Sequence, residues 1–255
     1  MELSRELQER ANAVIADPHY SGPNLSQKAL IAIEAPFGVG KSTITDQAIS
    51  MLAERGIKAG VVGSTMTRKR RPNDPENYTT DVDPEVIIER AERGEMINVT
   101  QNTTGHLYAT GFESVPYDVN IGPFLPDALA KLKLAKFGIV KSFYLVTTPE
   151  QWQKQLDMDK RLSQPDAARR IEEAENSLEY AINKLAHPDG GTPLQLIVND
   201  GSREIKQLAG HLLYATGYTE FEPSINKKVS VVEGKRLLHQ MYNYATMLQP
   251  DDKAA

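Results

Sequence analysis

Ala29-Leu30-Ile31-Ala32-Ile33-Glu34-Ala35-Pro36-Phe37-Gly38-Val39-Gly40-Lys41-Ser42-Thr43 is the stretch that decides the fold of this chain. Its first part, Leu30 to Ile33, is a short apolar run that predicts a buried strand. Glycines then predict a tight turn, and the apolar residues beyond it recur at helical spacing before Gly56: Ile44, Ala48, Met51 and Leu52. The stretch therefore predicts a strand, a glycine-bearing loop and a helix, in that order.

The loop between this strand and this helix, Ala35 to Ser42, fits the spacing of the Walker A pattern, with Ala35 in place of the first glycine. In such a loop, backbone N–H groups and a helix N-terminus surround phosphate oxygens, a lysine reaches the β- and γ-phosphates, and a serine ligates Mg²⁺. An ordinary glycine turn is the alternative, but it has no need of Lys-Ser directly after glycine. We therefore expect ATP and Mg²⁺ as cofactors, Ser42 as a metal ligand, and these ATP-binding residues: Gly38, Val39, Gly40, Lys41, Ser42 and Thr43.

The composition narrows the class of protein. The chain has 255 residues, of which 40% are hydrophobic and 25% charged, as in globular domains that bury a sizeable core. Its net charge of −5 argues against a general nucleic-acid binder, and the lack of cysteine excludes disulfides and thiolate metal sites. No apolar run approaches the length of a membrane span and no signal peptide stands out, so we expect a cytoplasmic protein without a membrane or nucleic-acid partner.

The most basic run of the chain, Ser64 to Pro72, follows a second short strand predicted at Ile57 to Gly63. Two strands joined by a helix favour a parallel sheet, and ligands of such sheets bind at the carboxyl ends of the strands. Arginine suits this place because its planar fork grips two phosphate oxygens at once. A solvated basic loop or a nucleic-acid patch is the alternative; beside a phosphate loop, we interpret the run as binding a substrate phosphate.

Further elements follow from capping residues, turn residues and periodicity. A charged segment between Lys154 and Arg170 precedes a long predicted helix, and Trp152 is interpreted as packing within the core or at a hinge. The predicted elements, in chain order, are a helix over 1–16, a helix over 83–94, short strands over 95–111, a helix over 127–137, a strand over 138–146, a helix over 171–185, a strand over 194–198, a helix over 202–213 and a helix near the C-terminus.

Asp118-Val119-Asn120-Ile121-Gly122 is interpreted as another strand end. A carboxylate at the end of a strand can hold the water shell of Mg²⁺, as a Walker B acid does. The alternative role for Asp118, that of a turn or cap residue, stays open, because the apolar run before it is poor.

Several motifs then stand in one order along the chain: Gly38-Val39-Gly40-Lys41-Ser42-Thr43, Ser64-Thr65-Met66-Thr67-Arg68-Lys69-Arg70-Arg71, Tyr78, Arg93-Gly94-Glu95-Met96-Ile97, Tyr108-Ala109-Thr110, Arg170-Ile171-Glu172-Glu173-Ala174-Glu175 with Leu178-Glu179-Tyr180-Ala181, and Leu196-Ile197-Val198-Asn199-Asp200. This order resembles the guanylate kinase family, whose members are phosphate-loop nucleoside monophosphate kinases. The resemblance covers about 29–217.

The resemblance implies a P-loop NTPase fold of the three-layer α/β type, with a parallel sheet as its core. It implies an acceptor-binding subdomain over about 64–115 and a lid over about 154–170. The segments 1–28 and 218–255 would be helical extensions, which we expect to pack on each other or to form a homodimer contact.

The resemblance also implies roles for particular residues. Lys41, Arg68, Arg161 and Arg170 would be catalytic, the last two as parts of the lid, and Asn199 would lie near the adenine of ATP. The acceptor would be bound by Ser64, Arg68, Arg71, Tyr78, Asn98, Tyr108 and Asp118.

Three positions depart from the family pattern. Asn98 stands where the family has the acid that pairs with the guanine edge, and an amide offers both a donor and an acceptor where a carboxylate offers only acceptors. Asn120 stands at the place of a second acid, and Arg70 replaces a proline in the basic loop.

These observations lead to three hypotheses. The first is a kinase that transfers the γ-phosphoryl group of ATP to a nucleoside monophosphate or deoxynucleoside monophosphate, with GMP as the default acceptor. The transfer depends on positioning and charge neutralisation, so it requires no strong base. The second is a catalytically weak, nucleotide-binding interaction module. The third keeps the chemistry but changes the acceptor to another phosphorylated small molecule, a change that Asn98 would explain.

Overall fold

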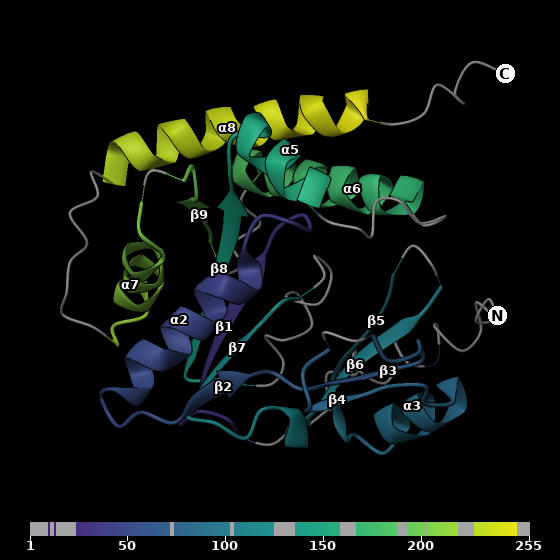
Figure 1. Ribbon diagram of the computed structural model, residues 1–255. Coiled ribbons are helices and arrows are strands. Elements are labelled where there is room, and N and C mark those ends of the chain that lie inside the picture. Colours follow the sequence, from purple (N-terminus) through teal and green to yellow (C-terminus); the bar gives the residue numbers. More distant parts are fainter. Residues whose placement is uncertain are drawn as a thin grey trace, which may run out of the picture. The chain divides into compact units, whose positions relative to one another are not determined.

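The structure is a computed structural model that describes residues 10, 13, 24–71, 74–102, 105–124, 136–158, 167–187, 193–201, 203–218 and 227–248 (Figure 1). Most of the helix predicted over 1–16 and most of the helix predicted over 127–137 lie outside these ranges. The chain divides into two compact units, one of Met1–Ala32 with Ile57–Val140 and the other of Ile33–Gly56 with Lys141–Ala255. Each unit is described by itself below.

The main sheet has five strands in the order β2-β7-β1-β8-β9. Their bounds are Ala59–Val61 for β2, Val119–Gly122 for β7, Ala29–Glu34 for β1, Ile139–Val146 for β8 and Leu194–Val198 for β9. β7 runs parallel to both β1 and β2, and β8 runs parallel to β9. All six residues of β1 are buried, as expected of a central strand in a parallel sheet. The predicted α/β fold, with a parallel sheet at its core, is confirmed.

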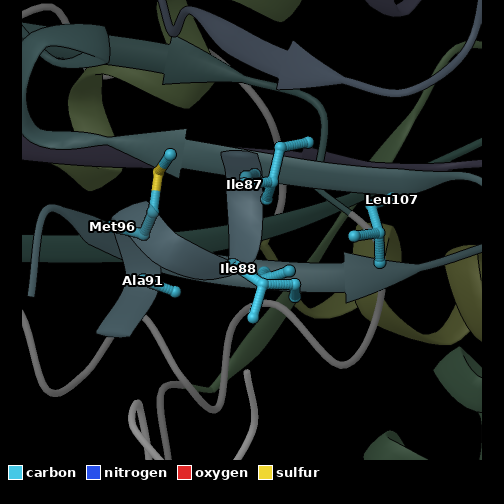
Figure 2. Close-up of a cluster of buried hydrophobic side chains, with 7 residues drawn as sticks. Ile87, Ile88, Ala91, Met96 and Leu107 are labelled. Carbon is cyan, nitrogen blue, oxygen red and sulfur yellow. The ribbon is translucent and has the colours of Figure 1, made fainter. Parts of the chain in front are cut away.

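A second sheet, in the order β4-β3-β6-β5, belongs to the first unit and is covered by helix α3. The strands are β3 at Ser64–Met66, β4 at Tyr78–Thr79, β5 at Met96–Gln101 and β6 at Leu107–Gly111, and a short 3₁₀ helix at Phe112–Ser114 follows. Helix α3 spans Pro84–Glu92, and the Asp83 side chain caps it by accepting from the Glu85 N–H. Its apolar face and the two longer strands share one core, drawn in Figure 2: Ile87, Ile88, Ala91, Met96, Val99, Leu107 and Ala109.

The second unit holds the helices α2, at Lys41–Ala53, α5, at Pro149–Met158, α6, at Ala167–Ala186, α7, at Ile205–Ala215, and α8, at Lys227–Met247. Helix α2 packs against α7, and α8 packs against α6, β9 and α5 (Figure 1). The approach of α8 to the sheet is close, since a Cβ at Gly234 would lie 2.9 Å from Leu196 Cδ1. Among the α8 side chains whose burial is described, those of Leu237, Leu238, Met241 and Ala245 are buried. The C-terminal helix is therefore part of this unit's core.

Among the described helices, none combines the length and apolar character that a membrane span requires.

Candidate functional site

The phosphate loop, residues 35–42, joins the buried end of β1 to the start of α2. Its turn depends on two glycines in the left-handed region, Gly38 at φ 79° and Gly40 at φ 93°, where a residue with a Cβ is strained. Gly40 is also limited in space, because a Cβ there would lie 3.1 Å from Asn199 Nδ2. Helix α2 begins directly after Gly40 and has no acidic residue in its first turn, so the positive end of its dipole faces the loop without a neutralising carboxylate of its own.

Side-chain donors hold four carbonyl groups of the phosphate loop. Lys41 Nζ donates to the Ala35 and Pro36 oxygens at 2.7 and 2.6 Å. Trp152 Nε1 donates to the Phe37 oxygen at 2.9 Å, and Asn199 Nδ2 donates to the Val39 oxygen at 3.1 Å. A trans peptide directs its C=O and N–H to opposite sides. Holding the Pro36, Phe37 and Val39 carbonyls therefore also fixes the directions of the N–H groups that follow them, those of Phe37, Gly38 and Gly40, and an anion-binding nest requires N–H groups whose directions are fixed.

The predicted ATP-binding residues thus belong to one loop and the helix it opens. Ser42 and Thr43 are exposed in the first turn of α2, and Asn199 reaches the loop from the residue after β9. The role of Ser42 as a Mg²⁺ ligand stays a prediction, since the described residues contain no cluster of three or more acidic, histidine or cysteine side chains suited to a metal.

Of the two arginines predicted in the lid, Arg161 lies outside the described residues. Arg170 stands in the first turn of α6, and its guanidinium carbon lies 6.0 Å from the centre of the Phe37 ring, within the range of a cation–π interaction. The charged residue is therefore held beside the phosphate loop by an aromatic residue of that loop.

Glu34 is a feature that sequence reasoning did not single out. It closes β1 and is 2% exposed, and Ser142 Oγ donates to its Oε1 at 3.3 Å. Burial raises the pKa of this carboxyl to about 8, and the Ser142 hydrogen bond and the charge of Lys184 offset only part of that rise. Within the described part of the chain, Oε2 has no hydrogen-bond partner. The available signal was a single carboxylate at the end of an otherwise apolar strand, directly before the loop.

In the first unit, the basic loop is organised by an ion pair that the sequence did not reveal. Arg68 Nη1 and Nη2 each lie 2.7 Å from an oxygen of Asp74, and both side chains are 8% exposed. This bidentate pair lowers the pKa of Asp74. Arg68 Nε also donates to the Tyr108 hydroxyl at 3.2 Å, which links two of the predicted acceptor residues. The fork of Arg68 is thus committed to a carboxylate, and its direct contact with a substrate phosphate stays a prediction.

Arg70 gives the basic loop the support that a proline would otherwise provide. Its Nη1 donates to the Tyr78 carbonyl at 2.9 Å, and its Nη2 donates to the Pro75 carbonyl at 3.0 Å. Asp74 in turn accepts from the Arg71 N–H at 2.7 Å. The loop is therefore fixed by hydrogen bonds to its own backbone, while the Arg71 side chain stays exposed.

The strand register of the second sheet brings several predicted acceptor residues to one face. Paired residues share a face of a sheet, and neighbours along a strand alternate. Val99 and Ala109 are paired and face α3, so Tyr108 faces the opposite side. Asn98 lies on the same side as Tyr108, because it precedes Val99 in the strand. Thr65 pairs with Ala109 and so faces α3, which places its neighbour Ser64 on the side of Tyr108, together with Tyr78, the residue paired with Ser64. We call the set Ser64, Tyr78, Asn98 and Tyr108 the polar face.

Asn98 reaches the polar face because β5 contains an irregularity. In a regular strand, residues two positions apart lie on the same face. The register shifts between Met96 and Asn98, so these two residues lie on opposite faces, and Met96 packs in the core beneath α3. Asn98 is 3% exposed, and its Oδ1 has no hydrogen-bond partner among the described residues. A buried amide oxygen of this kind is suited to accept a hydrogen bond from a ligand.

The prediction that Asp118 closes a strand is wrong. β7 begins after it, at Val119, and Val119 pairs with Ala29 at the start of β1. In this parallel pair, Asp118 therefore stands at the amino end, whereas the phosphate loop follows the carboxyl end of β1. Asn120 is fully buried and occupied by the fold, because its Nδ2 donates to the Tyr117 and Ala29 carbonyls at 2.8 and 3.3 Å. Neither side chain is placed to serve as a Walker B acid.

Comparisons with known proteins add one finding. No protein-family model matches this sequence, and no curated protein matches it. Among solved structures, the chain is similar to the guanylate kinase from Anaplasma phagocytophilum, with 13% sequence identity and a TM-score of 0.47 over 81% of this chain and 92% of that one. A likeness of this size assigns neither a family nor an activity, so the function has to be argued from the residues of the site.

Proposed function

We propose that this protein is a phosphotransferase that moves the γ-phosphoryl group of ATP to a nucleoside monophosphate or deoxynucleoside monophosphate, with GMP as the default acceptor. The observation that carries the proposal is the phosphate loop, whose carbonyls are held by Lys41, Trp152 and Asn199, so that the directions of its N–H groups are fixed directly before the start of α2. This arrangement supports binding of a polyphosphate.

In this proposal, the residues of the chain act by positioning and by neutralising charge. Lys41 would move from the loop carbonyls to the β- and γ-phosphate oxygens, and Arg170 would meet the negative charge that spreads over the transferred group. Ser42 would hold Mg²⁺, which when bound neutralises the phosphate oxygens and orients them. No side chain has to remove a proton, since the attacking atom is a phosphate oxygen.

The polar face would bind the acceptor. Tyr78, Tyr108 and the exposed Arg71 would contact its phosphate, and the Arg68–Asp74 pair would hold the basic loop in shape. Asn98 would read the base: its Oδ1 can accept from N1–H of guanine, and its amide nitrogen can donate to O6. An amide pairs equally well with other base edges, so the same residue also supports a changed acceptor, including another phosphorylated small molecule.

A second candidate, a catalytically weak nucleotide-binding module, is favoured by one observation. Asp118 stands at the amino end of its strand, so it does not occupy the strand end at which the sequence suggested a metal-shell acid. Such a module would bind ATP without transferring phosphate.

The test is product formation from ATP and Mg²⁺ with each common ribo- and deoxynucleoside monophosphate offered singly. We expect transfer to at least one of them, and loss of transfer in Lys41→Ala. Lys206→Ala, the same substitution at an exposed position of α7, is the matched control and should behave as the wild type. ATP binding without transfer to any acceptor would favour the binding module, and no binding of ATP would overturn both candidates.

A further inference from the structure

Trp152 is the only tryptophan of the chain, and it is buried beside the phosphate loop. It lies in α5 and is 1% exposed, and its Nε1 donates to the Phe37 carbonyl at 2.9 Å. The proposed reaction does not use this residue directly. A buried indole needs a partner for its N–H, and here that partner is the backbone of the loop itself.

The hydrogen bond fixes one particular peptide of the loop. Because the Phe37–Gly38 peptide is planar and trans, holding the Phe37 oxygen also fixes the direction of the Gly38 N–H. Gly38 has φ 79°, so the chain reverses at this point. Two side chains of α5 lie beside this glycine, since a Cβ at Gly38 would be in ordinary van der Waals contact with Leu156 Cδ2 at 3.5 Å and with Trp152 Nε1 at 3.6 Å. Helix α5 is thus packed against the backbone that would surround the phosphates.

Helix α8 supports the indole from a different part of the chain. The Tyr244 ring packs edge-on against Trp152, with 6.0 Å between ring centres, and the Phe37 ring makes a similar contact at 6.5 Å. The Met241 sulfur accepts from the Thr147 N–H at 3.2 Å, two residues before α5 begins. Thr148 then caps α5 by accepting from the Gln151 N–H, so the start of this helix is fixed from both sides.

We propose that Trp152 is a positioning residue of the phosphate loop and that Tyr244 of α8 holds its indole in place. This inference rests on the proposed function in assigning the loop to the phosphates of a nucleotide. It links the C-terminal helix to nucleotide binding through a chain of direct contacts: Tyr244 to Trp152, and Trp152 to the Phe37 carbonyl.

The first test is Trp152→Phe, which keeps an aromatic ring and removes the N–H. In this variant, amide hydrogen exchange measured without nucleotide should become about tenfold faster over residues 37–41. A tenfold change is about what the loss of one hydrogen bond causes in the equilibrium for local opening. Exchange in β9, on the same unit, should stay unchanged and is the internal control for a general loss of stability. Unchanged exchange over 37–41 would overturn the inference.

The second test separates ATP binding from acceptor binding. In Trp152→Phe, the KM for ATP should rise about tenfold while the KM for the acceptor stays the same, because only the phosphate loop is disturbed. An equal change in both values, or a change in neither, would contradict the positioning role. Should the wild type not bind ATP, the proposed function fails, and the exchange experiment still decides the inference.

Tyr244 provides a matched pair of variants. Tyr244→Phe keeps the ring that packs on Trp152 and should leave loop exchange and the KM for ATP as in the wild type. Tyr244→Leu removes the ring and should change both in the same direction as Trp152→Phe. In the wild type, the fluorescence of Trp152 should shift when MgATP is added, and Tyr244→Leu should reduce that shift. Equal behaviour of the two Tyr244 variants would overturn the part of the proposal that concerns α8.

Discussion

At the scale of single residues, the site is built by groups whose importance depends on burial. Glu34 and Asp74 are ordinary acids in the sequence, but both are nearly enclosed in the fold. The two acids differ in their hydrogen-bond partners: Asp74 accepts from the guanidinium of an arginine, whereas Glu34 accepts from a serine hydroxyl. An enclosed acid that is hydrogen-bonded to an arginine fork stays charged, whereas burial outweighs the serine hydrogen bond and the charge of Lys184 at Glu34 and raises its pKa.

Glu34 should make the stability of the protein depend on pH. Its pKa is about 8 in the fold, against 4.5 for the free group, so the folded state holds the proton more tightly between these values. The free energy of unfolding should therefore fall as pH rises from about 4.5 to 8, and the contribution of this group should be constant above that range. Glu34→Gln keeps an oxygen that accepts from Ser142, and it should remove this fall in the free energy of unfolding. Urea unfolding of both proteins between about pH 5 and about pH 9, a range that covers most of the interval between the two pKa values, would measure the difference. Glu54→Gln, at an exposed position, is the control, and a wild-type pH profile in Glu34→Gln would contradict the prediction.

Asp74→Asn should destabilise the protein by about 3 kcal/mol, because it leaves the enclosed Arg68 charge without its bidentate partner. Denaturant unfolding of the variant measures this cost. The exposed Glu233–Arg236 pair supplies a matched control, and Glu233→Gln should leave stability unchanged, since exposed ion pairs contribute little. If the two variants proved equally stable, the Arg68–Asp74 pair would have no special structural role.

At the scale of elements, α8 differs most from what the sequence suggested. The sequence predicted a helix near the C-terminus, which is correct, but it did not show whether this helix would cover the protein's own core or another chain. The structure places it against α6, β9 and α5. The contact of Gly234 with Leu196 explains why, since the missing side chain lets the helix approach the sheet.

Leu238→Ala should therefore cost about 3 kcal/mol in the free energy of unfolding, as expected when a large side chain is removed from a close-packed core. Val232 lies on the same helix with 72% of its surface exposed, so Val232→Ala should have little effect. Both values can be measured by urea unfolding. A negligible cost at Leu238 would mean that α8 is an appendage after all.

At the scale of the whole molecule, sequence reasoning succeeded where local structure depends on neighbours in the chain. The strand, phosphate loop and helix follow one another without interruption, so the pattern from Ala29 to Thr43 contained most of the information about them. It failed where partners are distant. Trp152 and Phe37 are separated by 115 positions, and the local sequence around neither of them indicates the other.

Asp118 illustrates the second cause of failure. Strand direction and strand bounds are set by pairing with β1 and β2, so a carboxylate beside a short apolar segment reads equally well as the beginning or the end of a strand. The Arg68–Asp74 pair shows a third cause, since a loop has no periodicity from which its side-chain contacts could be inferred.

The irregular step in β5 affects how this protein could change its substrate over evolutionary time. Regular alternation from Met96 would place Asn98 in the apolar core beneath α3, and the extra residue is what moves it to the polar face. Ligand preference can thus be altered in two ways, by a point substitution at Asn98 or by an insertion or deletion of one codon beside it. The second route would exchange the whole set of outward-facing residues of the strand at once, which allows an abrupt change of specificity where substitutions permit only gradual ones.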